Sequence, residues 1–124
     1  TEKAAAAMKF ELLPNEILID IFQQLNALDL FNAFDGLNNR LQQLIYNIPL
    51  DLNFQHVMKR RFDEFCSRMI SNPEIKTRIV SLNLSNDLDT YGQIKAFLRL
   101  FSLHEFPSLR SLTLIKPEAE EEDR

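Results

Sequence analysis

The sequence predicts a mixed α/β fold, in which a small helical module precedes a strand–helix–strand–helix–strand array. Three observations support this class. A helical pattern with a wide apolar stripe begins the chain, short segments of alternating apolar residues recur later at a constant spacing, and amphipathic helical patterns fill the intervals between those segments. Strands that alternate with helices at a fixed spacing are expected to lie parallel, joined by right-handed crossovers.

The first predicted helix begins at Pro14, because proline lacks the N–H that a first helical turn leaves unpaired and its φ is already helical. Apolar residues at positions 17, 18, 21, 22 and 25 form a stripe about 140° wide at 100° per residue. Such a short helix needs apolar cover from its own chain, from a partner, or from both. A second capped helical segment is expected to begin at Asp29.

The residues from Leu13 to Leu30 read Leu-Pro-x-Glu-Ile-Leu-x-x-Ile-Phe-x-x-Leu-x-x-x-Asp-Leu, which resembles the beginning of an F-box. The F-box is a three-helix module that docks substrate receptors onto the Skp adaptor of cullin–RING ubiquitin ligases. Residues 37–44 stand in the later half of the motif, with Leu41 where an aromatic residue is commoner. The resemblance spans residues 10–48, and we place the F-box domain at 8–48.

The resemblance implies that the apolar dipeptide and apolar side chains of the following helices contact the adaptor. Ile19 is a further candidate, since it lies about 200° from Ile17 on the helical wheel and so outside the stripe. A partner would explain an isoleucine there, although single exposed apolar residues are common. The candidate adaptor-binding residues are Leu13, Pro14, Ile17, Leu18, Ile19, Ile21, Leu30 and Leu41.

Three segments of alternating apolar residues follow at a spacing of 30 residues, namely Leu50–Phe54, Val80–Leu84 and Arg110–Leu114. Alternation is the pattern of a strand with one buried face. Helices are therefore expected over 55–71 and 90–104, with Asp89-Thr90 as the cap of the second. The apolar sides of these helices are expected to hold Met58, Phe62, Phe65, Cys66 and Met69 in the first, and Ile94, Phe97, Leu98 and Phe101 in the second.

The third of these units reads Leu109-x-x-Leu112-x-Leu114, which resembles a leucine-rich repeat. The spacing is slightly long for that family, and Asp87 and Pro117 stand where the repeat has Asn or Cys. We therefore assign 49–115 to a partial leucine-rich-repeat-like region and 116–124 to an acidic tail. An F-box followed by such repeats implies a substrate receptor whose F-box faces the ligase and whose repeats hold the substrate.

The composition bounds the class of protein. The 124 residues are 45% hydrophobic and 26% charged, which is typical of a globular protein. A net charge of −4 argues against a nucleic-acid partner, and no apolar run is long enough to span a membrane. Residues Thr1–Ala7 lack the apolar core of a signal peptide, and we interpret them as an extension outside the fold. A cytoplasmic or nuclear location is the default expectation.

Few residues suggest chemistry. One cysteine excludes an internal disulfide and a multi-cysteine zinc site, and Cys66 is expected to be a buried small hydrophobe. His56 and His104 have no Asp, Glu or Cys at metal-ligand spacing. The basic cluster at 59–61 is interpreted as a solvated helix face offset by Asp63 and Glu64, with contact to phosphate or nucleic acid as the alternative.

The sequence therefore favours a substrate-receptor subunit of an SCF-type cullin–RING ubiquitin ligase that is not itself an enzyme and needs no cofactor or metal. Its expected partners are a Skp-type adaptor, a cullin through that adaptor, and a protein substrate, with neither nucleic acid nor membrane. Two alternatives stay open. The chain could be a plain interaction module, a helical cap on a short repeat array in which Leu13 and Pro14 pack inward. It could also be a small enzyme, which would need a pocket with converging polar groups.

Overall fold

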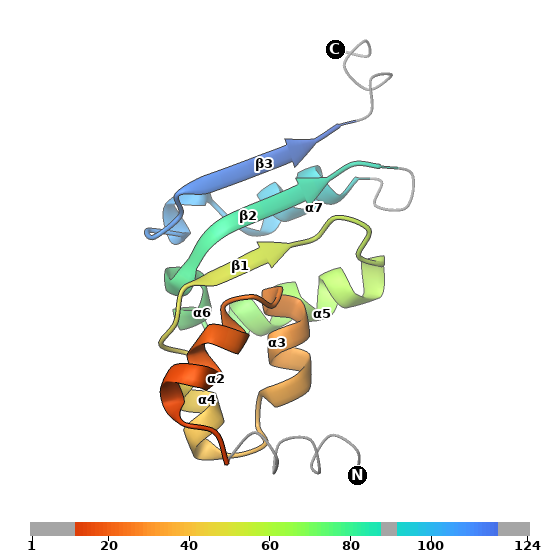
Figure 1. The fold of residues 1–124 in the computed structure, drawn as a ribbon. Coiled ribbons are helices and arrows are strands. Elements are labelled where there is room, and N and C mark those ends of the chain that lie inside the picture. Colours follow the sequence, from red (N-terminus) through yellow and green to blue (C-terminus); the bar gives the residue numbers. More distant parts are fainter. Residues whose placement is uncertain (1–11, 88–91, 117–124) are drawn as a thin grey trace.

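The computed structural model describes residues 12–87 and 92–116. The helices of the first part lie beside one edge of a parallel sheet, and later helices lie against one face of that sheet (Figure 1). In chain order the elements are α2 (Asn15–Phe22), α3 (Ala27–Phe34), α4 (Asn39–Ile45), β1 (Leu50–Asn53), α5 (Lys59–Ser71), α6 (Glu74–Arg78), β2 (Ile79–Ser85), α7 (Gln93–Leu100), the 3-10 helix η2 (Leu103–Glu105) and β3 (Ser111–Ile115). The predicted mixed α/β class and the parallel strands are confirmed.

The spacing of 30 residues is the register of the sheet. The strands lie in the order β1-β2-β3, and Leu52 pairs with Leu82, which pairs with Leu112. Leu52 and Leu82 are fully buried against the helices, whereas Leu112 on the outer strand is 40% exposed. Among the described residues no helix covers the opposite face of the sheet (Figure 1).

One hydrophobic core runs through both halves of the chain. Phenylalanine rings connect the elements, with Phe31 of α3 at 5.7 Å from Phe65 of α5, and Phe54 at 6.2 Å from Phe97 of α7. The buried cluster continues from α2 to the turn before β3 without a break. The core is thus continuous across residue 48, where the sequence suggested that one module ends and the next begins.

Several predicted helix boundaries are wrong. Pro14 is the N-cap of α2 and not its first helical residue, and α3 begins at Ala27 after an Asn26 cap instead of at Asp29. The segment expected to be one helix over 90–104 contains α7 and η2, and the expected Asp89-Thr90 cap lies outside the described residues. The short helix α6 was not predicted, because Asn72-Pro73 indicated only the end of α5.

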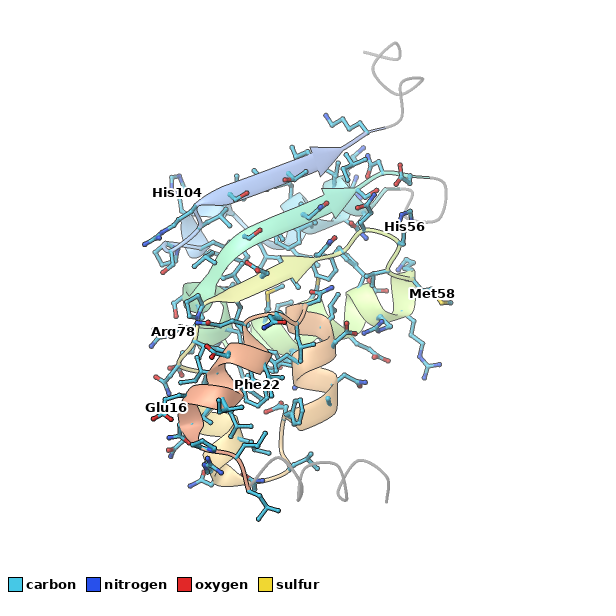
Figure 2. All side chains as sticks on the ribbon, in the orientation of Figure 1. Glu16, Phe22, His56, Met58, Arg78 and His104 are labelled. Atoms are coloured by element: carbon cyan, nitrogen blue, oxygen red, sulfur yellow. The ribbon has the colours of Figure 1, made fainter. Side chains whose placement is uncertain are left out.

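Two residues expected in the core are exposed. Met58 is the extended N-cap of α5, so its side chain is 71% exposed and extends away from the molecule (Figure 2). Leu98 is 49% exposed, because the buried face of α7 is formed by Gln93, Ile94 and Phe97. The buried face of α7 is therefore rotated toward Gln93 and away from Leu98.

Gln93 and Asn86 form a buried polar link at the carboxyl end of β2. The Gln93 Nε2 donates to the carbonyl oxygen of Phe54 at 2.9 Å, and its Oε1 accepts from the Ser85 N–H at 2.8 Å. The Asn86 Oδ1 accepts from the Ile94 N–H at 3.0 Å. The buried asparagine of this unit is therefore one residue before Asp87, the position that the repeat pattern indicated.

Candidate docking surface

The start of α2 is held in a fixed position by α4. The carbonyl oxygen of Pro14 accepts from the N–H groups of Ile17 and Leu18, both at 3.1 Å. Arg40 of α4 donates from Nε to the Asn15 Oδ1 at 3.0 Å and from Nη2 to the carbonyl oxygen of Leu13 at 2.5 Å. Hydrogen bonds from a charged donor are among the stronger ones in proteins. The dipeptide that precedes α2 is thus anchored by its backbone.

Apolar side chains are nevertheless exposed at this anchored helix start. Ile17 is 44% exposed, Pro14 is exposed, and Leu13 and Ile21 are half-buried. Positions 14, 17 and 21 fall within about 60° of one another on a helix at 100° per residue. We call the four residues Leu13, Pro14, Ile17 and Ile21 the α2 apolar strip.

Ile19 lies on the other flank of α2. It is half-buried and packs against the core, and it is about 200° from Ile17 on the helical wheel. The core-facing side between them holds Leu18 and Phe22, and Figure 2 shows Phe22 turned toward the other helices. A partner on the α2 apolar strip would therefore not reach Ile19 through the same face.

Three of the predicted adaptor-binding residues are core residues. Leu18, Leu30 and Leu41 have no exposed surface, because each occupies the inward position of its helix. They cannot contact a partner while the chain keeps this fold, so we withdraw them as contact residues. The sequence pattern could not separate them from Ile17, since both kinds of position are aliphatic and lie next to each other on the same helix.

Charged pairs link the helical module to α5. Arg61 contacts Asp29 at 3.1 Å, and Arg68 pairs with Asp35 while its guanidinium lies 5.6 Å from the centre of the Phe31 ring. The predicted solvated face of α5 is confirmed in its pairs, with Lys59 on Asp63 at 2.7 Å and Arg60 on Glu64 at 3.3 Å, all largely exposed.

The residues considered for catalysis or metal binding, namely Cys66, His56 and His104, do not form a cluster. Cys66 is buried as predicted, and desolvation by burial, with a smaller contribution from Asp63, raises the pKa of its thiol to about 12. His56 and His104 lie at opposite ends of the sheet (Figure 2). Within residues 12–87 and 92–116, no group of three or more His, Cys, Asp or Glu side chains is placed to hold a metal ion.

A second feature that sequence reasoning missed is a pocket of about 400 Å³ at the amino ends of the strands. Arg78 and Arg110 line it together with Ser108 and Val80. The only signal in the sequence was a basic residue just before each of two consecutive strands, at a similar but not identical repeat position.

No helix in the described part of the chain is both long and apolar enough to cross a membrane. No protein-family model, curated protein or solved structure matches this chain.

Proposed function

We propose that this chain is a substrate-receptor subunit that docks onto a Skp-type adaptor of a cullin–RING ubiquitin ligase through the α2 apolar strip. The observation that carries the proposal is the combination of exposure and anchoring at one helix start. Pro14 and Ile17 are exposed, while Arg40 holds the backbone of Leu13 and the side chain of Asn15. An apolar surface that is already ordered loses little conformational entropy when a partner covers it.

The energetic argument concerns the strip as a whole. Full burial of one Leu or Ile side chain is worth about 1.5–3 kcal/mol, and Ile17 has the most left to gain among the two isoleucines of the strip. Leu13 and Ile21 are already half-buried and contribute less. The adaptor would then also contact polar neighbours such as Glu16, which extends from α2 toward solvent (Figure 2).

The chain itself would do no chemistry in this role. By holding a substrate near a ubiquitin-loaded enzyme elsewhere in the ligase, it would raise the effective concentration of the substrate. The substrate would bind the repeat-like region, in which no described helix covers the second face of the sheet (Figure 1). Short polar side chains line that face in register, with Asp51 beside Ser81 and Ser111, and Asn53 beside Asn83 and Thr113.

The alternative of a plain helical cap made a distinct prediction, namely that Leu13 and Pro14 pack inward. Pro14 is exposed, whereas Leu13 is half-buried and packs against the core. The exposure of Pro14 therefore favours docking, while the packing of Leu13 agrees with the cap.

Calorimetric titration of the chain with a purified Skp-type adaptor tests the proposal. Leu13→Ala with Pro14→Ala should weaken binding at least tenfold, and more than any single surface charge reversal does. Ile17→Asp should abolish it, because a carboxylate would be buried without a partner. The matched control is Ile70→Asp, since Ile70 is a similarly exposed isoleucine, 55% exposed, on a different helix, α5. Absence of binding by the unaltered chain, or equal affinity of the variants and the control, would refute the docking assignment.

A further inference from the structure

The three parallel strands begin at the same end of the sheet, and the pocket of about 400 Å³ lies at that end. Arg78 immediately precedes β2 and Arg110 immediately precedes β3, so parallel pairing brings the two arginines to the same end of the sheet. Both arginines line the pocket, as does Ser108. The volume is within the range of about 300–1,000 Å³ that small-molecule sites occupy.

The side chains of the two arginines have no acidic partner in the part of the chain that the structure describes. The Nε of Arg78 is buried and has no hydrogen-bond partner within residues 12–87 and 92–116. A buried donor without an acceptor is unfavourable, and most native structures avoid one. Because solvent does not reach this Nε, an acceptor in the pocket would have to approach Arg78 through its terminal Nη groups.

The pairing of β1 with β2 is irregular next to the pocket. β1 pairs Leu50 with Ile79 but Asp51 with Ser81, so Val80 is an extra residue in β2. A β-bulge of this kind redirects neighbouring side chains and is frequent next to binding sites. The Arg110 N–H donates to the Val80 carbonyl oxygen at 2.8 Å, which ties the start of β3 to the bulge.

We propose that this pocket binds a phosphate monoester group. Two guanidinium groups supply two positive charges with planar pairs of donors, which suit the three oxygens and the charge of about −1.5 to −2 on a phosphate monoester. The Ser108 hydroxyl adds a neutral donor. A single carboxylate would balance only one of the two arginines. The group belongs either to a small phosphorylated molecule or to a phosphorylated side chain of a peptide. The inference does not depend on adaptor docking, because the pocket is complete within this chain.

The test is a titration of the whole ¹⁵N-labelled chain, without any adaptor, followed by NMR at the arginine Nε–Hε groups. Phenyl phosphate is the first probe, and benzoate is the singly charged comparison. Saturable shifts are expected at Arg78 and Arg110, with affinity for phenyl phosphate at least tenfold above that for benzoate. Shifts that do not saturate, or equal affinity for the two probes, would overturn the proposal.

Variants separate the site from general attraction between charges. Arg78→Gln and Arg110→Gln should each lower the affinity for phenyl phosphate about tenfold, because each removes one charge-assisted hydrogen-bonding group from the pocket. Arg99→Gln is the matched control, because Arg99 is an exposed arginine on α7 that does not line the pocket. Arg110 is exposed, so its replacement should leave the fold intact even if replacement of Arg78 disturbs it. Unchanged affinity in Arg110→Gln would overturn the proposal.

A second pair of probes distinguishes a small phosphorylated molecule from a phosphorylated peptide as the ligand. Phosphoserine amide and a phosphoserine peptide with apolar flanking residues are compared at the same site. Tighter binding of the peptide assigns the pocket to a phosphorylated segment of a protein, and equal binding assigns it to small phosphorylated molecules. Binding of neither probe would refute the site.

Discussion

The side-chain amide of Asn26 pairs with both backbone groups of Asn53. Its Nδ2 donates to the Asn53 carbonyl oxygen at 2.8 Å, and its Oδ1 accepts from the Asn53 N–H at 3.1 Å. The amide thus takes the place of a neighbouring strand at the free edge of β1, where unpaired backbone groups invite pairing with another chain. Because Asn26 is also the N-cap of α3, one residue joins the helical module to the sheet.

Replacement of Asn26 by alanine is expected to lower the free energy of unfolding by about 1–3 kcal/mol, because it removes the cap and leaves two backbone groups of β1 without their partner. Asn26→Asp keeps the acceptor but loses the donor, so its effect should be intermediate. Urea unfolding followed by circular dichroism measures both. Asn47→Ala is the control, since the Asn47 amide makes one exposed bond to the Gln43 carbonyl oxygen. If Asn26→Ala and Asn47→Ala cost the same, Asn26 has no special role at this edge.

The sheet was predictable because the spacing of 30 residues between its apolar segments equals the strand register. The equal spacing of Leu52, Leu82 and Leu112 predicted which strands pair and that they are parallel, and their alternation with polar residues predicted the buried face. The role of Asn26 was not predictable, because its partner is 27 residues away and an asparagine before a helix indicates only a cap.

The docking candidates show the same limit. Apolar periodicity identified α2 as a helix with a wide stripe, but it could not say that Leu18 faces the core while Ile17 faces solvent. That distinction depends on where α3 and α4 pack against α2, and the residues of α2 alone do not determine this. The arginine pocket was missed for a related reason, since Arg78 and Arg110 become neighbours only when the strands pair.

The outer strand provides a matched comparison of burial. Leu84 and Leu114 are register partners, yet Leu84 is fully buried and Leu114 is 43% exposed. Leu84→Ala should lower the free energy of unfolding by about 2–5 kcal/mol, as in other large-to-small core replacements. Leu114→Ala should cost less than about 1.5 kcal/mol, because folding removes less apolar area of the Leu114 side chain from water. Denaturant titrations of the two variants check this, and similar decreases would mean that Leu114 is buried in solution.

Cys66 should be unreactive in the folded chain. With a thiol pKa raised to about 12 by burial, the thiolate fraction at pH 8 is on the order of 10⁻⁴. Iodoacetamide at pH 8 should therefore leave the native protein unmodified over hours, and should label it within minutes in 6 M guanidinium. Mass spectrometry counts the adduct. Rapid labelling without denaturant would show that α5 opens readily.

Acid should weaken the contact between α6 and η2. Lys76 donates to the Glu105 Oε1 at 2.5 Å, and this bond, together with the Ser102 backbone bond, lowers the pKa of the Glu105 carboxyl. A carboxyl whose pKa is lower in the folded state stabilises the fold above its unfolded-state pKa. That stability disappears as the pH falls through the folded-state pKa. Glu105→Gln should flatten the fall in unfolding free energy below pH 4.5, measured by urea titration at several pH values. Glu64→Gln, in an exposed pair on α5, is the control for the loss of a surface carboxylate, and an equal effect of the two variants would contradict the prediction.

Arg40 should act on docking by positioning. Its bonds to the Leu13 carbonyl oxygen and the Asn15 side chain hold the strip without forming part of its apolar surface. Arg40→Met would keep the aliphatic stem but release those acceptors, so the segment before α2 would become ordered only on binding, which costs conformational entropy. We expect adaptor affinity to fall about three- to tenfold, with faster amide hydrogen exchange in the first turn of α2. Arg60→Met, at an exposed position of α5, should change neither quantity. Weaker binding without faster exchange would instead mean that Arg40 touches the adaptor directly.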